Sequence, residues 1–135
     1  MIFVDSSFWI AVRNVSDPQH REAAQLWAAS RDDQLVTTNH VRGETWTYLQ
    51  QKAGRRAAVD FLDSLERSAR ARVHFVTEDQ EAQALRWLRR HDEREYSFVD
   101  ATSFVLMRSL RIREALAFDG DFSAAGFVEL RATPG

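Results

Sequence analysis

The chain begins with a short apolar run that ends in a carboxylate. Ile2-Phe3-Val4 shows no alternation with polar residues, and Asp5 follows it directly. Such a run is typical of a strand buried on both faces, as in a parallel sheet covered by helices. Asp5 then lies at the carboxyl end of that strand, where open α/β sheets bind ligands. A carboxylate buried there costs free energy unless a positive or hydrogen-bonding group compensates it.

Strand and helix patterns alternate along the rest of the chain. Further short apolar runs indicate strands at residues 35–37, 73–76, 115–118 and 127–130. Helical patterns cover residues 8–12, 19–31, 41–52, 57–65, 77–88 and 98–110. Strands that alternate with helices predict an α/β fold, in which three layers (α/β/α) enclose a mostly parallel sheet of about five strands.

Length and composition limit the class of protein. The chain has 135 residues, enough for one domain with a sizeable core, and its 44% hydrophobic and 28% charged residues are ordinary for a globular protein. No apolar stretch is long enough to span a bilayer, and Met1 leads straight into the first strand without a signal peptide. The absence of cysteine excludes disulfides and thiolate metal sites, so we expect a cytoplasmic protein. Residues 133–135 are expected to form a frayed tail.

Acidic residues recur where a hydrophobic core does not need them. Two follow predicted strands, one lies beside the apolar stripe of helix 41–52, and one lies in the first turn of the apolar helix 98–110. These positions are Asp5, Glu44, Asp100 and Asp119, with Asp121 two residues after the last.

Each acid has a purely structural alternative. Asp100 can close a capping box with Ser97, and Asp5 can cap the helix that follows it. Glu44 can be a solvated helix residue, and the last two acids can simply form the turn around Gly120. Together these alternatives weaken, because the carboxyl ends of parallel strands and the starts of the following helices converge on one crevice.

Converging carboxylates call for a cation. Acids within a few ångströms of one another repel and raise one another's pKa values, and a divalent cation relieves that repulsion. Oxygen ligands without cysteine favour Mg²⁺ or Mn²⁺ over zinc. Such ions polarise phosphoryl oxygens and lower the pKa of bound water. The pattern therefore indicates phosphodiester chemistry.

Four motifs, in this order, resemble those of PIN-domain ribonucleases, specifically the VapC-type toxins of toxin–antitoxin pairs. They are Ile2-Phe3-Val4-Asp5-Ser6-Ser7-Phe8-Trp9, Asn39-His40-Val41-Arg42-Gly43-Glu44-Thr45-Trp46, Tyr96-Ser97-Phe98-Val99-Asp100-Ala101 and Ala117-Phe118-Asp119-Gly120-Asp121-Phe122. Each motif is loose alone, but the ordered set is specific and spans essentially the whole chain. The resemblance implies a single PIN domain over residues 1–135.

The resemblance also implies an activity and a site. It implies an endoribonuclease that uses Mg²⁺, with Mn²⁺ as a substitute, to hydrolyse phosphodiester bonds in structured transfer or ribosomal RNA and so to inhibit translation. The acidic, metal-binding pocket would consist of Asp5, Glu44, Asp100 and Asp119. Ser6 matches the family's hydroxyl position and would orient the acids. Asp119 fits the fourth acidic position better than Asp121, but the doubled acid leaves both open.

Partners follow from the same resemblance. VapC-like proteins are usually homodimers neutralised by a cognate VapB-like antitoxin, and an antitoxin arginine can enter the acid pocket. Because acids repel RNA, arginines must supply the phosphate contacts, and the net charge of −2 shows no global basic surface. The candidates are Arg13, Arg42, Arg89, Arg90 and Arg94.

Two other functions stay open beside the toxin. One is a PIN nuclease of RNA processing, although a standalone domain of this length favours the toxin. The other is a catalytically inactive PIN scaffold that only binds RNA. A scaffold would be expected to lose acids, and this chain keeps all of them.

Overall fold

A single parallel sheet forms the centre of the molecule. The computed structural model describes residues 1–133, and Pro134 and Gly135 of the predicted tail lie outside this range. The strands are β1 (Ile2–Val4), β2 (Leu35–Thr38), β3 (Ala71–His74), β4 (Glu114–Leu116) and β5 (Val128–Glu129). Their order is β3-β2-β1-β4-β5, and each neighbouring pair is parallel. The predicted parallel α/β fold is therefore confirmed.

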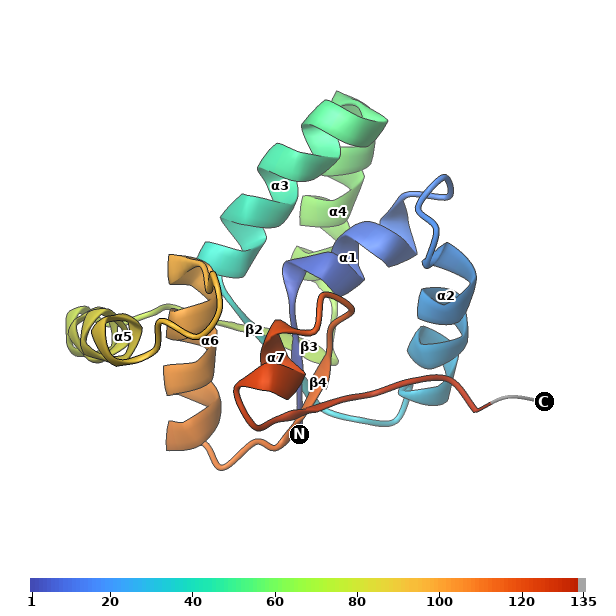
Figure 1. The fold of residues 1–135 in the computed structure, drawn as a ribbon. Helices are drawn as coiled ribbons and strands as arrows, with labels where there is room; N and C mark the ends of the chain where they lie inside the picture. Colours follow the sequence, from blue (N-terminus) through green and yellow to red (C-terminus); the bar gives the residue numbers. More distant parts are fainter. Residues whose placement is uncertain (134–135) are drawn as a thin grey trace.

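Helices cover both faces of this sheet. They are α1 (Ser6–Arg13), α2 (His20–Ala29), α3 (Asn39–Ala53), α4 (Arg55–Arg67), α5 (Glu78–Arg90), α6 (Phe98–Ser109) and α7 (Asp121–Ala124). Figure 1 shows α1 and α2 on one side of the sheet, and α5 and α6 on the other. The hairpin of α3 and α4 rises beyond the strand ends, and Gly54 joins its two helices at φ +96°, a left-handed conformation that favours glycine. Among residues 1–133, no helix is both long and apolar enough to cross a membrane.

The core explains why the first strand carries no polar alternation. Phe3 and Val4 of β1 are completely buried, since helices cover the sheet on both faces. In α6 every residue from Asp100 to Met107 is buried. Phe104 lies at the centre of an aromatic cluster, with ring centroids 5.0–5.7 Å away. Its neighbours are Trp87, Tyr96, Phe122 and Phe127.

Several strand boundaries and one helix differ from the sequence-based expectation. The predicted strand 115–118 is β4 (Glu114–Leu116), which ends two residues earlier because its neighbour β1 ends at Val4, opposite Leu116. The predicted strand 73–76 begins and ends two residues earlier, because β3 pairs only with the four residues of β2. Phe75 consequently lies beyond the sheet and is 62% exposed. The last strand has only two residues, since β5 pairs with Glu114 and Ala115 alone. The short helix α7 was not expected, because a four-residue helix leaves no periodicity to detect.

The aromatic cluster allows a test of the core. Phe104→Ala should lower the free energy of unfolding by about 3–5 kcal/mol, because the surrounding rings cannot close the cavity. Urea denaturation followed by circular dichroism measures this loss. Val15→Ala, at a position that is 78% exposed, is the control and should change stability by less than about 0.5 kcal/mol. Equal effects of the two variants would contradict this account of the core.

Candidate metal centre

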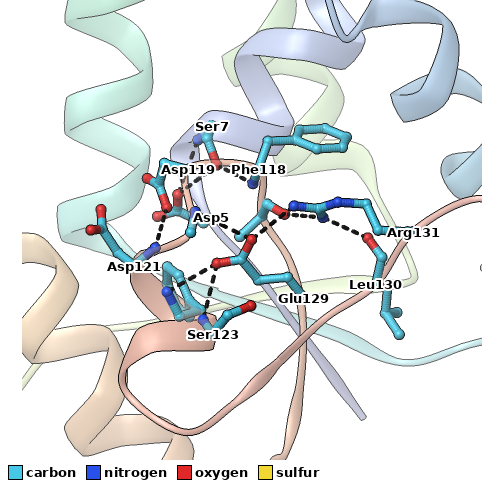
Figure 2. A network of polar contacts seen from close by, with 12 residues as sticks. Asp5, Ser7, Phe118, Asp119, Asp121, Ser123, Glu129, Leu130 and Arg131 are labelled. Carbon is cyan, nitrogen blue, oxygen red and sulfur yellow. Dashed lines mark hydrogen bonds and ion pairs between the residues drawn. The ribbon is translucent and has the colours of Figure 1, made fainter.

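The acids meet at the carboxyl edge of the sheet, where three helices begin. Asp5 follows β1 and caps α1, accepting a hydrogen bond from the backbone N–H of Ser7. Asp100 lies in the first turn of α6. Asp119 follows β4 across a two-residue connection, and Asp121 begins α7. Figure 2 shows Asp5, Asp119 and Asp121 side by side at this edge.

Three of these carboxylates form a tight group. Asp100, Asp119 and Asp121 each offer one oxygen, and these oxygens all lie within 4.8 Å of one another. The backbone N–H of Asp121 donates to Oδ1 of Asp119 at 3.1 Å, which keeps the two side chains of the turn close. Both candidates for the fourth acid are therefore present at the same place, and the geometry does not separate them.

Asp5 has one satisfied and one unsatisfied oxygen. Its Oδ2 accepts from the Ser7 hydroxyl at 2.8 Å and from the Ser7 backbone N–H at 3.2 Å. The carboxylate is 1% exposed, and within the described residues Oδ1 is buried without a hydrogen-bond partner. A buried carboxylate oxygen without a donor is unfavourable unless a cation compensates it.

Ser7 is a site residue that the sequence analysis missed. Its hydroxyl donates to Asp5 and accepts from the backbone N–H of Phe118 at 3.0 Å, so it ties the end of β1 to the segment after β4 (Figure 2). The only local signal was the second serine after Asp5. Its partner Phe118 is too distant in the sequence for any motif to show.

Ser6 and Glu44 form a separate contact beside this group. The Ser6 hydroxyl donates to Oε1 of Glu44, which joins the start of α1 to α3. Glu44 is exposed and lines a hollow together with His40, Tyr48 and Val99. Val99 precedes Asp100, so Glu44 lies at the rim of the site rather than within the tight acid group.

The structural alternative for Asp100 is also correct. Oδ2 of Asp100 accepts from the Ser97 backbone N–H at 3.0 Å, and the Ser97 hydroxyl accepts from the Asp100 N–H at 2.9 Å. This capping box fixes the carboxylate at the start of α6. The two roles of Asp100 are compatible, because its cap is formed with Ser97 and its place in the acid group is defined by Asp119 and Asp121.

One predicted arginine reaches the acids. Nε of Arg94 lies 2.6 Å from Oδ1 of Asp121, and its Nη2 donates to the Asp119 backbone oxygen at 3.0 Å. The other four lie elsewhere. Arg13 lines a hollow with two tryptophans, Arg42 lies over the Phe75 ring, Arg90 lines a hollow on α5 and α6, and Arg89 is exposed on α5.

Burial and mutual repulsion shift the titration of the acids. Burial raises the pKa of Asp5 well above its ordinary value, and the charges of Asp119 and Asp100 raise it further. Burial raises the pKa of Asp100 to about 7. The hydrogen bonds with Ser97 oppose this rise, and the charges of Asp121 and Asp119 add to it. Burial and the charge of Asp121 raise the pKa of Asp119 to about 6.

This arrangement fits a divalent metal ion. The donors are all carboxylate oxygens, which suit hard divalent cations. Oδ1 of Asp5, which has no hydrogen-bond partner among residues 1–133, and the raised pKa values both indicate negative charge that these residues leave without a counter-charge. Asp5, Asp100, Asp119 and Asp121 are the residues positioned to hold such an ion.

The raised pKa values predict how stability depends on pH. In the unfolded chain Asp100 titrates near its ordinary pKa of about 4, whereas in the folded protein its pKa is about 7. The folded state therefore binds more protons between these values, and the metal-free protein should lose stability as the pH rises from about 4 to about 7.

The test is urea denaturation of metal-free protein across this pH range. Because asparagine carries no charge, Asp100→Asn should be more stable than the wild type at pH 7.5, by about 2 kcal/mol, and the gap should close at low pH. A wild-type stability that increases up to neutral pH, with no gain in Asp100→Asn, would refute the electrostatic account.

The chain is similar to known proteins in both sequence and fold. Residues 2–128 match the PIN domain family. The 23S rRNA-specific endonuclease VapC20 of two Mycobacterium tuberculosis strains is 58% identical over 131 residues, which cover 97% of this chain and 98% of the relative. The crystal structure of Mycobacterium tuberculosis VapC20, described as a Sarcin-Ricin loop cleaving toxin, is 56% identical with a TM-score of 0.92 and covers 97% of this chain and 99% of that one.

Sequence, fold and site thus agree with one another. The ordered motifs, the five-stranded parallel sheet and the acid group at its carboxyl edge are shared features of one family of divalent-metal-dependent nucleases. The chain belongs to the PIN-domain family of endoribonucleases, within its VapC toxin group.

Proposed function

We propose that this toxin hydrolyses a phosphodiester bond in the sarcin–ricin loop of 23S ribosomal RNA and thereby inhibits translation. The observation that carries the proposal is the acid group with its buried Asp5 oxygen, which no donor in the described part of the chain reaches, in a chain that is 58% identical to a 23S rRNA-specific endonuclease. Residues 1–135 act in this proposal as one PIN domain.

The proposed ligands of the metal are Asp5, Asp100 and Asp119, with Glu44 at the rim. Mg²⁺ is the proposed physiological ion, because its preference for carboxylate and water oxygens suits this donor set, and Mn²⁺ would substitute. When bound, such an ion lowers the pKa of a water molecule and polarises a phosphoryl oxygen. Asp121 is the alternative to Asp119 as a ligand. Because its carboxylate is paired with Arg94, we assign Asp121 a supporting role in the site.

The protein's own side chains prepare the site in three ways. Ser7 holds Oδ2 of Asp5, which leaves Oδ1 directed to a ligand. The capping box fixes Asp100, and the hydroxyl of Ser6 orients Glu44. Hydrolysis forms a bond between a water oxygen and phosphorus and breaks the bond to the 3′ oxygen, which leaves 5′-phosphate and 3′-hydroxyl ends. In this proposal the exposed Glu44 accepts the proton that the attacking water loses, and the leaving 3′ oxygen takes up a proton from solvent.

The proposed partners are a VapB-like antitoxin and a second copy of the chain. Support for the antitoxin comes from Arg94, whose guanidinium already binds a carboxylate of this acid group, so that an antitoxin arginine can be accommodated in the same way. The homodimer is proposed because VapC toxins usually form homodimers. A ribosomal substrate would place the activity in the cytoplasm.

Cleavage of a defined RNA panel tests the function. Purified protein with Mg²⁺ or Mn²⁺ should cut a sarcin–ricin loop RNA at one position, and EDTA should abolish the cut. Asp100→Asn should lower the rate by at least about 100-fold, because a charged ligand is lost. Val15→Ala, at an exposed position in the loop between α1 and α2, should cut like the wild type. Cleavage of transfer RNA alone would contradict the proposed ribosomal substrate. Tight RNA binding without any cleavage would favour a catalytically inactive PIN scaffold.

Arg94 should contribute to RNA binding. In the non-cleaving Asp100→Asn background, Arg94→Ala should weaken binding of the loop RNA roughly tenfold and make it less dependent on salt, since one phosphate contact is lost. Fluorescence anisotropy at several salt concentrations measures both effects. Arg31→Ala, an exposed arginine after α2, is the matched control. Equal losses in both variants would show that Arg94 acts only through the general charge of the protein.

A further inference from the structure

A fifth carboxylate lies directly behind the acid group. Glu129 belongs to the edge strand β5, yet its side chain is only 2% exposed. Its Oε1 accepts from the backbone N–H of Gly120 at 3.3 Å, and its Oε2 accepts from the N–H groups of Phe122 and Ser123, both at 3.1 Å. Figure 2 shows this carboxylate pointing into the turn that carries Asp119 and Asp121.

These three donors determine the shape of the turn. The first N–H groups of a helix have no partner within the helix, and α7 is too short to be stable by itself. Glu129 supplies the acceptors that this first turn needs. Gly120 adopts φ +83°, a left-handed conformation, and its N–H is part of the same set. The conformation between Asp119 and Ser123 therefore depends on a side chain from the neighbouring strand.

Arg131 holds this carboxylate in place. Its Nη2 lies 2.9 Å from Oε1 of Glu129, and its Nη1 donates to the backbone oxygens of Ala117 and Leu130, each at 2.8 Å. The guanidinium also lies over the Phe118 ring, 5.1 Å from its centroid. Arg131 thus connects Glu129 to the segment directly before Asp119 and neutralises its charge beside the other acids.

Glu129 is not a further metal ligand. Oε1 already accepts from the Gly120 N–H and from Arg131, and Oε2 accepts from the N–H groups of Phe122 and Ser123. A carboxylate has about four acceptor positions, so all of them are occupied by donors. This contrasts with Asp5, whose Oδ1 has no partner among the described residues.

We propose that Glu129, held by Arg131, is a positioning residue that sets the metal affinity of the acid group through the Asp119–Asp121 turn. The inference rests on the proposed metal-dependent function. Arg94 contacts the same turn from outside, where its side chain is 41% exposed, whereas Glu129 is the inner anchor. The turn therefore keeps its conformation when Arg94 moves to an RNA phosphate.

Binding of Mn²⁺ to the full chain, followed by the electron paramagnetic resonance signal of free Mn²⁺, tests the inference without any cleavage. Glu129→Gln places an amide NH₂ against backbone N–H donors and should weaken Mn²⁺ binding about tenfold, and Glu129→Ala should weaken it more. Leu65→Ala, in the buried face of α4, is the control for a general loss of stability. It should lower Tm but change the Mn²⁺ affinity by less than about twofold.

A second measurement separates positioning from mere destabilisation. The RNA cleavage rate of Glu129→Gln should be low at limiting Mn²⁺ and recover toward the wild-type rate as Mn²⁺ is raised, whereas Leu65→Ala should need no additional Mn²⁺. Unchanged Mn²⁺ affinity in folded Glu129→Ala, or an equal loss in Leu65→Ala, would overturn the positioning role alone. If the wild type bound no Mn²⁺, or if Asp100→Asn bound Mn²⁺ as tightly as the wild type, the proposed metal site would be wrong. This inference would then be wrong as well.

Discussion

Repulsion among buried carboxylates is the constraint that organises this structure. Asp5 and Asp100 are nearly inaccessible to water, and burial raises the pKa of both. The charge of Asp119 raises both pKa values further, and the charge of Asp121 raises that of Asp100. The fold partly offsets this cost by placing the acids where three helices begin, since the N-termini of helices carry partial positive charge. The remaining excess of negative charge is what a divalent cation would neutralise.

Capping and chemistry are carried by the same side chains. Asp5 caps α1 and Asp100 closes a capping box on α6, yet both belong to the acidic site. A cap fixes the side chain by backbone hydrogen bonds, and a metal site needs ligands with fixed positions. A local structural role is therefore no argument against a functional one at these positions. Glu129 also combines the two roles. It accepts hydrogen bonds from the first N–H groups of α7, and these bonds shape the turn that carries Asp119 and Asp121.

The acids and the arginines have different distributions. The acids converge, whereas of the five candidate arginines only Arg94 contacts them, and the others lie on separate surfaces. RNA binding must therefore overcome a negative field at the centre with contacts spread over the periphery. Arg94 links the acid group to this periphery, because it pairs with Asp121 and is exposed enough to reach a phosphate.

The sequence alone determined the parallel α/β fold and the family, because these depend on local patterns: apolar runs, helix caps and the order of motifs. From the same patterns it predicted four acidic site residues, of which the structure groups Asp100 and Asp119 and leaves Glu44 at the rim. It left Asp119 and Asp121 unresolved, and the fold brings both to the same place. Only the tertiary structure decided that Ser7 supports Asp5 through Phe118, 111 residues away, and that Glu129 and Arg131 brace the acidic turn. It also decided where β3 ends, since an edge strand is only as long as its partner allows. Such contacts join residues that are distant in the chain, and one sequence contains no signal for which distant residues meet.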